Sequence, residues 1–137
     1  MSNKIKVGIV GYGNIGRGVE FALKKNPDME LVAVFTRRDP ESIKTVDPQT
    51  KVLEVSQAPD FQDEIHVMLL CGGSATDLPQ QGPYFAKMFN TVDSYDNHSK
   101  IPEYFAAVDA AAREGGKTSI ISVGWDPGLF SLNRMLA

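Results

Sequence analysis

The sequence predicts an α/β protein built on a doubly wound parallel sheet with the strand order 3-2-1-4-5-6. Three observations favour this fold. Short apolar runs alternate with amphipathic segments, glycine-rich turns follow several of the runs, and no internal repeat interrupts the alternation. The apolar runs are nearly continuous, which is typical of strands covered on both faces. The 137 residues are 42% hydrophobic, which suits one globular domain with a proper core.

The sequence predicts six strands, over residues 5–10, 31–35, 52–55, 67–71, 90–93 and 118–123, and apolar runs mark most of them. Apolar positions three and four residues apart predict helices over 15–25, 79–89, 101–113 and 129–137. Asn26-Pro27-Asp28 is expected to end the first helix, and Gly115-Gly116 the third. Residues 38–51 are polar and include two prolines, so we expect a loop with at most one short helical turn.

A glycine-rich segment, Gly11-Tyr12-Gly13-Asn14-Ile15-Gly16, follows the first strand with the spacing of a dinucleotide-binding turn. Gly11 permits the tight turn, Gly13 lets the backbone approach the phosphates, and Gly16 lets the helix pack closely on the strand. The N–H groups and the positive end of the helix dipole then face the phosphates. A Rossmann-type dinucleotide site is therefore expected, and a plain glycine turn is the alternative.

The end of the second strand indicates which dinucleotide binds. NAD sites usually carry an acidic residue there, which accepts hydrogen bonds from the ribose 2′-hydroxyl. This chain instead has Thr36-Arg37-Arg38, while Glu30 lies at the other end of the strand. Two guanidiniums and a hydroxyl suit a 2′-phosphate, which a carboxylate would repel. NADP is therefore expected rather than NAD, and a solvated basic turn is the alternative.

The segment after the fourth strand, residues 71–77, is rich in small residues. Ligands of doubly wound sheets lie beyond the carboxyl ends of the strands, so small residues there let the backbone pass close to a cofactor. Ser74 and Thr76 can donate hydrogen bonds, and alternatively Ser74, Thr76 or Asp77 caps a helix. We expect Cys71 to be a buried strand residue rather than a nucleophile.

Residues 93–98 follow the fifth strand and are too polar for a buried element. They are expected where the nicotinamide end of the cofactor lies, and Asp96 is suited to bind a substrate ammonium group. The alternative is that Asp93 or Asp96 shapes the turn or caps a helix. His98 is expected to be a turn residue rather than a catalyst.

Residues 124–128 follow the sixth strand and include Trp125, Asp126 and Pro127. Trp125 offers an apolar wall, and a carboxylate beside it is suited to bind or deprotonate an amine. The alternative is a helix start, with Asp126 as the N-cap and Pro127 at the first helical position.

Composition excludes several other classes of function. The net charge is −3 and the basic residues form no long run, so no nucleic-acid surface is expected. A single cysteine excludes an intrachain disulfide framework and fits a reducing compartment. No signal peptide is seen, and no apolar stretch approaches the roughly 20 residues that span a bilayer. We expect a soluble cytoplasmic protein, and the two scattered histidines indicate no metal site.

Taken together, the motifs resemble the meso-diaminopimelate dehydrogenase family. The resemblance rests on GYGNIGRGVE, FTRR, LCGGSATD, TVDSYDNH and ISVGWDPGLFSLNR, and it covers essentially the whole chain. It implies an NADP-dependent amino-acid dehydrogenase of the bacterial lysine and cell-wall pathway. The implied reaction is the reversible oxidative deamination of meso-2,6-diaminopimelate to L-2-amino-6-oxopimelate and ammonia.

The resemblance also assigns residues to the cofactor and the substrate. It implies that Asp96 and Asp126 hold the reacting end of the substrate, with Trp125 beside them, and these two carboxylates are the expected catalytic residues. The general base stays unassigned. The expected cofactor-binding residues are Gly11, Tyr12, Gly13, Asn14, Ile15, Gly16, Thr36, Arg37, Arg38, Cys71, Gly72, Gly73, Ser74, Ser94, Tyr95, Asp96, Val123, Gly124, Trp125, Asp126 and Pro127.

The family has a further domain, which completes the substrate pocket and forms a homodimer. That domain is absent from these residues, so residues 1–137 are expected to be the NADP-binding domain, which binds NADP but deaminates the substrate poorly or not at all. Two alternatives stay open. One is a non-catalytic NADP-sensing module, which would need no acidic residues at the nicotinamide end. The other is a different NADP-linked amino-acid or aldehyde dehydrogenase.

Overall fold

A computed structural model describes residues 3–124, 127 and 129–136 of the chain. The strands are β1 (Ile5–Val10), β2 (Met29–Thr36), β3 (Val52–Glu54), β4 (Val67–Leu70), β5 (Asn90–Asp93) and β6 (Ser119–Ile120). The α-helices are α1 (Asn14–Lys24), α2 (Leu78–Ala86), α3 (Ile101–Gly115) and α4 (Leu129–Leu136). Three short 3-10 helices connect them, η1 (Pro40–Ser42), η2 (Val55–Phe61) and η3 (His98–Lys100).

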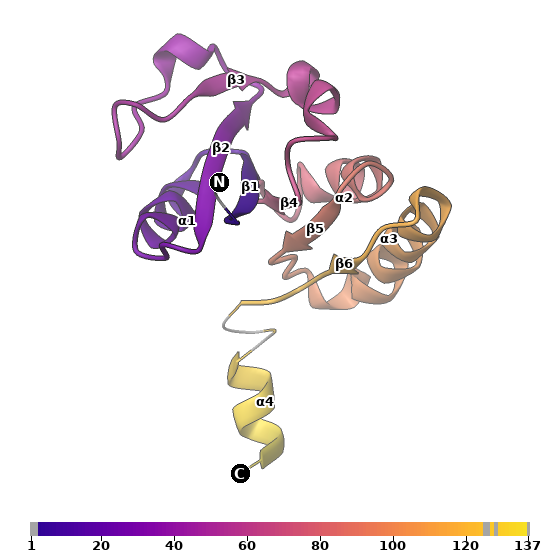
Figure 1. Cartoon of the computed structure of the whole chain (residues 1–137). Helices are drawn as coiled ribbons and strands as arrows, with labels where there is room; N and C mark the ends of the chain where they lie inside the picture. Colours follow the sequence, from indigo (N-terminus) through magenta and orange to yellow (C-terminus); the bar gives the residue numbers. More distant parts are fainter. Residues whose placement is uncertain (1–2, 125–126, 128, 137) are drawn as a thin grey trace. The chain divides into compact units, whose positions relative to one another are not determined.

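The strands form one six-stranded sheet in the order β3-β2-β1-β4-β5-β6. β1 pairs in parallel with both β2 and β4, β2 pairs in parallel with β3, and β5 pairs in parallel with β6. Strands and helices alternate along the chain, as Figure 1 shows. The predicted doubly wound, Rossmann-type fold and its strand order are therefore confirmed.

The sixth strand is shorter than the sequence predicts, because it covers only Ser119–Ile120 and not residues 118–123. Ser122 has a left-handed φ of 60°, which turns the chain out of the strand conformation. The N–H groups of Ser122 and Val123 donate to the side chain and the backbone carbonyl of Asp93. The strand prediction was thus wrong for Thr118 and for residues 121–123, and Asp93 holds the backbone of the second segment at Ser122 and Val123.

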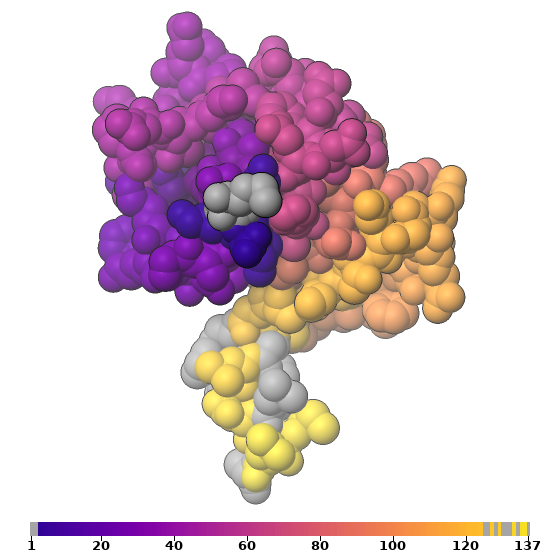
Figure 2. Space-filling view, viewed as in Figure 1, coloured from indigo at the N-terminus to yellow at the C-terminus, as the bar shows by residue number. Residues whose placement is uncertain are grey.

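The chain divides into two compact units, Met1–Gly72 and Gly73–Ala137. In the first unit, α1 packs against β1 and β2 around a buried apolar cluster that includes Val7, Ile9, Leu23 and Val34 (Figure 1). The space-filling view shows the side chains of this unit, coloured from indigo to magenta, packed as one body (Figure 2). The cluster fixes where α1 begins, and so it also fixes the turn that precedes α1.

In the second unit, α2 packs on α3 and on β5. Two glycines make this packing possible. A Cβ atom at Gly82 would clash with the hydroxyl group of Tyr104, and one at Gly115 would clash with the backbone carbonyl of Lys87. α3 ends after Gly115 because Gly116 takes a left-handed φ of 67°, as expected for a helix C-cap. None of the helices in the described part of the chain is both long enough and apolar enough to cross a membrane.

Candidate functional site: the strand ends

The glycine turn after β1 has the conformation that the sequence predicts. Gly11 has a φ of 90°, and its N–H donates to the carbonyl of Phe35 at 2.8 Å. A Cβ atom at Gly16 would clash with the Gly11 carbonyl, so only glycine lets α1 start this close to β1. A Cβ atom at Gly13 would meet nothing within 4 Å. The conformational roles of Gly11 and Gly16 are confirmed, whereas contact of Gly13 with a phosphate stays a prediction.

The start of α1 is open to solvent. Asn14 and Ile15 are exposed, and Ile15 keeps 51% of its surface accessible although it is apolar. The first N–H groups of a helix have no partner within the helix, and they carry its positive dipole end. The exposed turn therefore has the chemistry and the space to receive an anion such as a pyrophosphate.

Arg38 is brought to this turn from the end of β2. Its Nη2 donates to the backbone carbonyl of Tyr12 at 2.7 Å, across 26 residues of sequence. Its N–H donates to Oγ1 of Thr36 at 3.0 Å, and Thr36 is itself buried. Arg37 and Arg38 are both exposed, and the Arg38 guanidinium lies at the glycine turn through its bond to Tyr12. Glu30 lies at the other end of β2, as the sequence predicts, and there it pairs in register with Lys6 of β1.

The end of β4 lies against the same turn. The N–H of Cys71 donates to the carbonyl of Val10 at 2.8 Å, and a Cβ atom at Gly11 would lie 3.2 Å from the backbone nitrogen of Gly72. Burial raises the pKa of the Cys71 thiol to about 12, so it stays protonated at neutral pH. Cys71 is half-buried and follows β4, so the expected place within a buried strand was wrong, and the absence of a nucleophilic role stays a prediction.

Residue Glu20 of α1 is part of this first unit and was missed by the sequence reasoning. It is fully buried, and its carboxylate accepts a hydrogen bond from the Tyr12 hydroxyl at 2.5 Å. A signal was available, since Gly16, Glu20 and Leu23 are spaced four and three residues apart and form the buried face of α1. Glutamate in such a row indicates a buried, hydrogen-bonded carboxylate.

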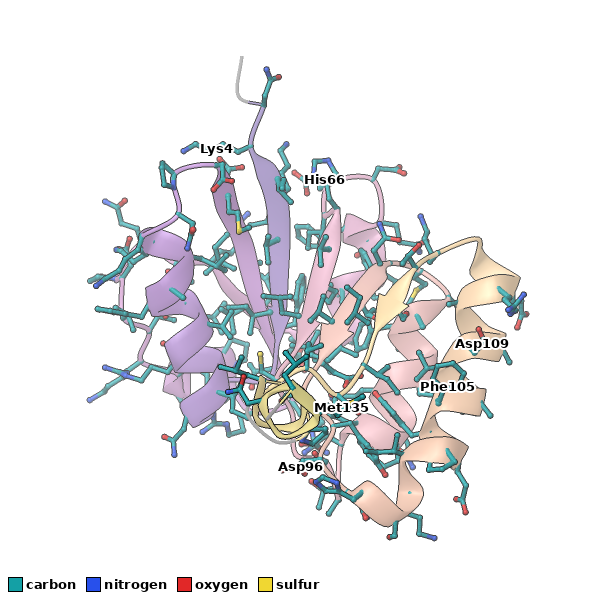
Figure 3. All side chains as sticks on the ribbon, turned by 90° about the horizontal axis from the view of Figure 1, so that it is seen from below. Lys4, His66, Asp96, Phe105, Asp109 and Met135 are labelled. Atoms are coloured by element: carbon teal, nitrogen blue, oxygen red, sulfur yellow. The ribbon has the colours of Figure 1, made fainter. Side chains whose placement is uncertain are left out.

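In the second unit, the segments after β4 and β5 meet. The N–H of Asp96 donates to the Ser74 hydroxyl at 3.0 Å, and the N–H of Gly73 donates to the Asp77 carboxylate at 3.0 Å. Asp77 precedes α2 but makes no side-chain cap bond to it, so it shapes the turn instead. Asp96, labelled in Figure 3, follows the end of β5, and its side chain is exposed. The Asp96 carboxylate is therefore open to a cationic group.

Asp93 fixes the backbone on both sides of this region. Its Oδ1 accepts hydrogen bonds from the N–H groups of Tyr95 and Ser122, both at 3.0 Å. Its Oδ2 accepts from the Tyr104 hydroxyl at 2.5 Å. Burial, together with this bond to Asp93, raises the pKa of Tyr104. The rings of Tyr95 and Tyr104 stack with centroids 4.0 Å apart. Asp93 thus shapes the turn, which was one of the two roles left open for it.

The remaining predicted site residues lie after β6. Trp125 and Asp126 fall outside the described residues, so the structure gives no position for them or for the proposed N-cap. Gly124 accepts a hydrogen bond from the N–H of Leu129 at 2.9 Å, and Pro127 is half-buried. His66 accepts a hydrogen bond at Nδ1 from the N–H of Lys6 at 3.0 Å, and it lies at the end of its unit where β1 and β4 begin (Figure 3). Within the described residues, no three His, Cys, Asp or Glu side chains form a group able to hold a metal.

The fold and the glycine turn define a Rossmann-type α/β domain of the kind found in nicotinamide-dependent dehydrogenases. No family model matches the chain. The chain is 68% identical over 134 residues to "Meso-diaminopimelate D-dehydrogenase" of Ureibacillus thermosphaericus, covering 98% of this chain and 41% of that one. It is 47% identical over 133 residues to the enzyme of that name from Corynebacterium glutamicum, covering 97% of this chain and 40% of that one.

Solved structures agree with these relatives. The C. glutamicum DAP dehydrogenase in complex with DAP has a TM-score of 0.88 at 47% identity, covering 100% of this chain and 41% of that one. An engineered D-amino acid dehydrogenase bound to NADP+ also has a TM-score of 0.88 at 47% identity, covering 97% and 40%. The chain therefore matches, in sequence and in fold, the N-terminal part of the meso-diaminopimelate dehydrogenases, and the resemblance is confirmed. It spans 41% of the length of the first of these relatives.

Proposed function

We propose that this chain is the NADP-binding part of an oxidoreductase that catalyses the reversible oxidative deamination of meso-2,6-diaminopimelate. The observation that carries the proposal is the position of Arg38. This residue follows β2, and its guanidinium donates a hydrogen bond to the Tyr12 carbonyl in the glycine turn after β1. That position suits a ribose 2′-phosphate, which distinguishes NADP from NAD. The relatives named above supply the reaction, because one is solved with DAP and another with NADP+.

The residues of the first unit fit the cofactor at both of its phosphate groups. The pyrophosphate would lie on the exposed start of α1, where Gly13 leaves space for close approach. The 2′-phosphate would take charge-assisted hydrogen bonds from Arg37 and Arg38, with Thr36 beside them. When bound, NADP+ supplies the acceptor for the hydride of the amino-bearing carbon, after which water releases ammonia. Cys71 to Ser74, Ser94 to Asp96 and Val123 to Pro127 complete the proposed set of cofactor contacts.

Asp96 and Asp126 are the residues proposed for the substrate end. A carboxylate attracts the substrate ammonium group and holds the reacting carbon in position, which lowers the barrier by orientation. The Asp96 backbone is fixed by Ser74 and its carboxylate is exposed, which supports this role. Trp125 is proposed as the apolar wall beside Asp126.

The rest of the proposal concerns the whole protein. The matched relatives are longer, so we expect the substrate pocket to need a second domain, and we expect these 137 residues alone to deaminate poorly. The full-length protein is proposed to be a cytoplasmic homodimer of the diaminopimelate and lysine pathway, without nucleic-acid or membrane partners. A comparison of meso-, LL- and DD-diaminopimelate as substrates of the full-length protein tests the reaction. Activity on the meso isomer alone is expected, and equal rates on all three would contradict the proposal.

The cofactor is tested by titrating the chain with NADPH and NADH while following fluorescence. We expect NADPH to bind more tightly, and we expect Arg37→Ala with Arg38→Ala to weaken NADPH by roughly 10- to 100-fold, the usual contribution of a charge-assisted hydrogen bond. NADH has no 2′-phosphate, so its affinity should change little and serves as the control. An unchanged NADPH affinity would remove the arginine pair from the site.

A further inference from the structure

The Glu20 carboxylate accepts four hydrogen bonds inside the first unit. Its Oε1 accepts from the Tyr12 hydroxyl at 2.5 Å and from the N–H of Val46 at 2.9 Å. Its Oε2 accepts from the Thr50 hydroxyl at 2.6 Å and from the N–H of Asp47 at 3.2 Å. The N–H of Val46 also lies 3.1 Å from the Tyr12 hydroxyl oxygen. One side chain of α1 therefore ties the loop between β2 and β3 to the glycine turn.

These hydrogen bonds stabilise the ionised form of the Glu20 side chain. Burial alone would raise the pKa of the carboxyl group, but the bonds from Thr50, Tyr12, Val46 and Asp47 outweigh burial and lower it. The four donors are neutral groups, so each bond is charge-assisted on the acceptor side only. A fully buried carboxylate that has satisfied both of its oxygens holds its donors in one geometry.

Tyr12 connects the buried Glu20 carboxylate to Arg38. Its side chain is bound to Glu20, while its backbone carbonyl accepts the Arg38 guanidinium at 2.7 Å. Its two neighbours, Gly11 and Gly13, have no side chain that packs to hold the turn. The side chain of Tyr12 is buried, so it holds the turn from the protein side rather than from the ligand side.

We propose that Glu20 is a positioning residue for cofactor selectivity. By fixing Tyr12, it holds the Arg38 guanidinium at the place where a 2′-phosphate would bind. This inference rests on the proposed NADP binding and deepens it. A pre-aligned guanidinium loses less side-chain freedom on binding, and the gain applies only to a ligand that carries the 2′-phosphate. Loss of the bond between Tyr12 and Glu20 should therefore weaken NADPH binding more than NADH binding, because only NADPH carries the 2′-phosphate that Arg38 is proposed to bind.

Two matched variants separate this role from a purely structural one. Tyr12→Phe removes the hydroxyl that binds Oε1 of Glu20, and Thr50→Val removes the hydroxyl that binds Oε2 at nearly the same distance. Both variants take one strong donor from the same buried carboxylate, but only Tyr12 contacts Arg38. They also avoid Glu20→Gln, which would disturb all four bonds at once.

The measurement is the ratio of NADPH to NADH affinity, obtained by fluorescence titration of the full chain. We expect Tyr12→Phe to lower this ratio about tenfold, near the lower end of what a hydrogen bond to a charged group contributes, and Thr50→Val to leave it unchanged. In an Arg38→Ala background, Tyr12→Phe should have no further effect on the ratio, because the two residues act through one contact.

Other results would overturn the inference in distinguishable ways. A wild-type protein without preference for NADPH would overturn the proposed cofactor and this inference together. A preserved preference in Tyr12→Phe, or an equal loss in Thr50→Val, would overturn the inference alone. So would an undiminished effect of Tyr12→Phe in the Arg38→Ala background. Circular dichroism of each variant confirms that the comparison is made between folded proteins.

Discussion

In the second unit, Asp93 holds two segments that are far apart in the sequence, so its loss should disturb both of them. It is buried, and its carboxylate and carbonyl hold the backbone of Tyr95, Ser122 and Val123. Ser122 is a non-glycine residue with a φ of 60°, a conformation that is held only where the surroundings fix it. The hydrogen bonds to Asp93 provide this constraint, so the segments after β5 and β6 depend on one side chain.

Tyr104→Phe tests the contribution of Asp93 without removing its charge. The variant leaves Oδ2 of a buried carboxylate without its 2.5 Å donor, which should lower the free energy of unfolding by roughly 2 kcal/mol. Urea unfolding measures the change, with an unchanged m-value expected. Phe105→Ala, at an exposed position next in sequence, is the control and should change the stability by less than about 0.5 kcal/mol. Equal stability of Tyr104→Phe and wild type would show that the bond contributes nothing.

The stability of wild type and Tyr104→Phe should also differ in its dependence on pH in the alkaline range. The pKa of Tyr104 is raised in the folded state, chiefly by burial, so the folded protein holds this proton more tightly than the unfolded chain. The stabilisation is complete below the unfolded value of about 10 and is lost as the pH rises above it. Wild-type stability should therefore fall above that pH, and Tyr104→Phe should fall less steeply. Tyr12, whose pKa is also raised, keeps part of the slope in both proteins.

At the scale of elements, the sequence predicts β1, β2 and β4 well because each is a nearly continuous apolar run. It also predicts β5, although Val92 is the one apolar residue among its four. It overestimates β6, since the segment after Ile120 has strand-like side chains, whereas the N–H groups of Ser122 and Val123 donate to Asp93. It misses η2, where Glu54 and Gln57 form a capping box that opens a helix with a proline inside. The η2 segment has no regular spacing of apolar residues, so a prediction based on that spacing does not detect it.

For the candidate site, the sequence predicts features that depend on neighbouring residues but not contacts between residues far apart in the chain. Local sequence predicts the glycine turn, because φ values and close packing are properties of neighbouring residues. It also predicts that an arginine pair ends β2. It does not predict that Arg38 binds the carbonyl of Tyr12, or that Glu20 accepts the Tyr12 hydroxyl, because these contacts depend on the packing of α1 against the sheet.

At the scale of the whole chain, cofactor binding and stability are linked. A ligand that binds only the folded state adds about 2.7 kcal/mol at one hundred times its Kd. A chain of this size gains roughly 3–5 °C in Tm for each kcal/mol, so saturating NADPH should raise the Tm by roughly 10 °C.

The melting curve, followed by circular dichroism, measures this shift. NADH at the same concentration should produce a smaller one, because it lacks the 2′-phosphate that Arg37 and Arg38 are expected to bind. Arg38→Ala should reduce the NADPH shift, measured from the Tm of the free variant, towards the NADH value, because the variant lacks the guanidinium proposed to bind the 2′-phosphate. Equal shifts from both dinucleotides in the wild type would mean that the chain recognises their common adenine, ribose and pyrophosphate groups, and that the end of β2 takes no part in selecting between them.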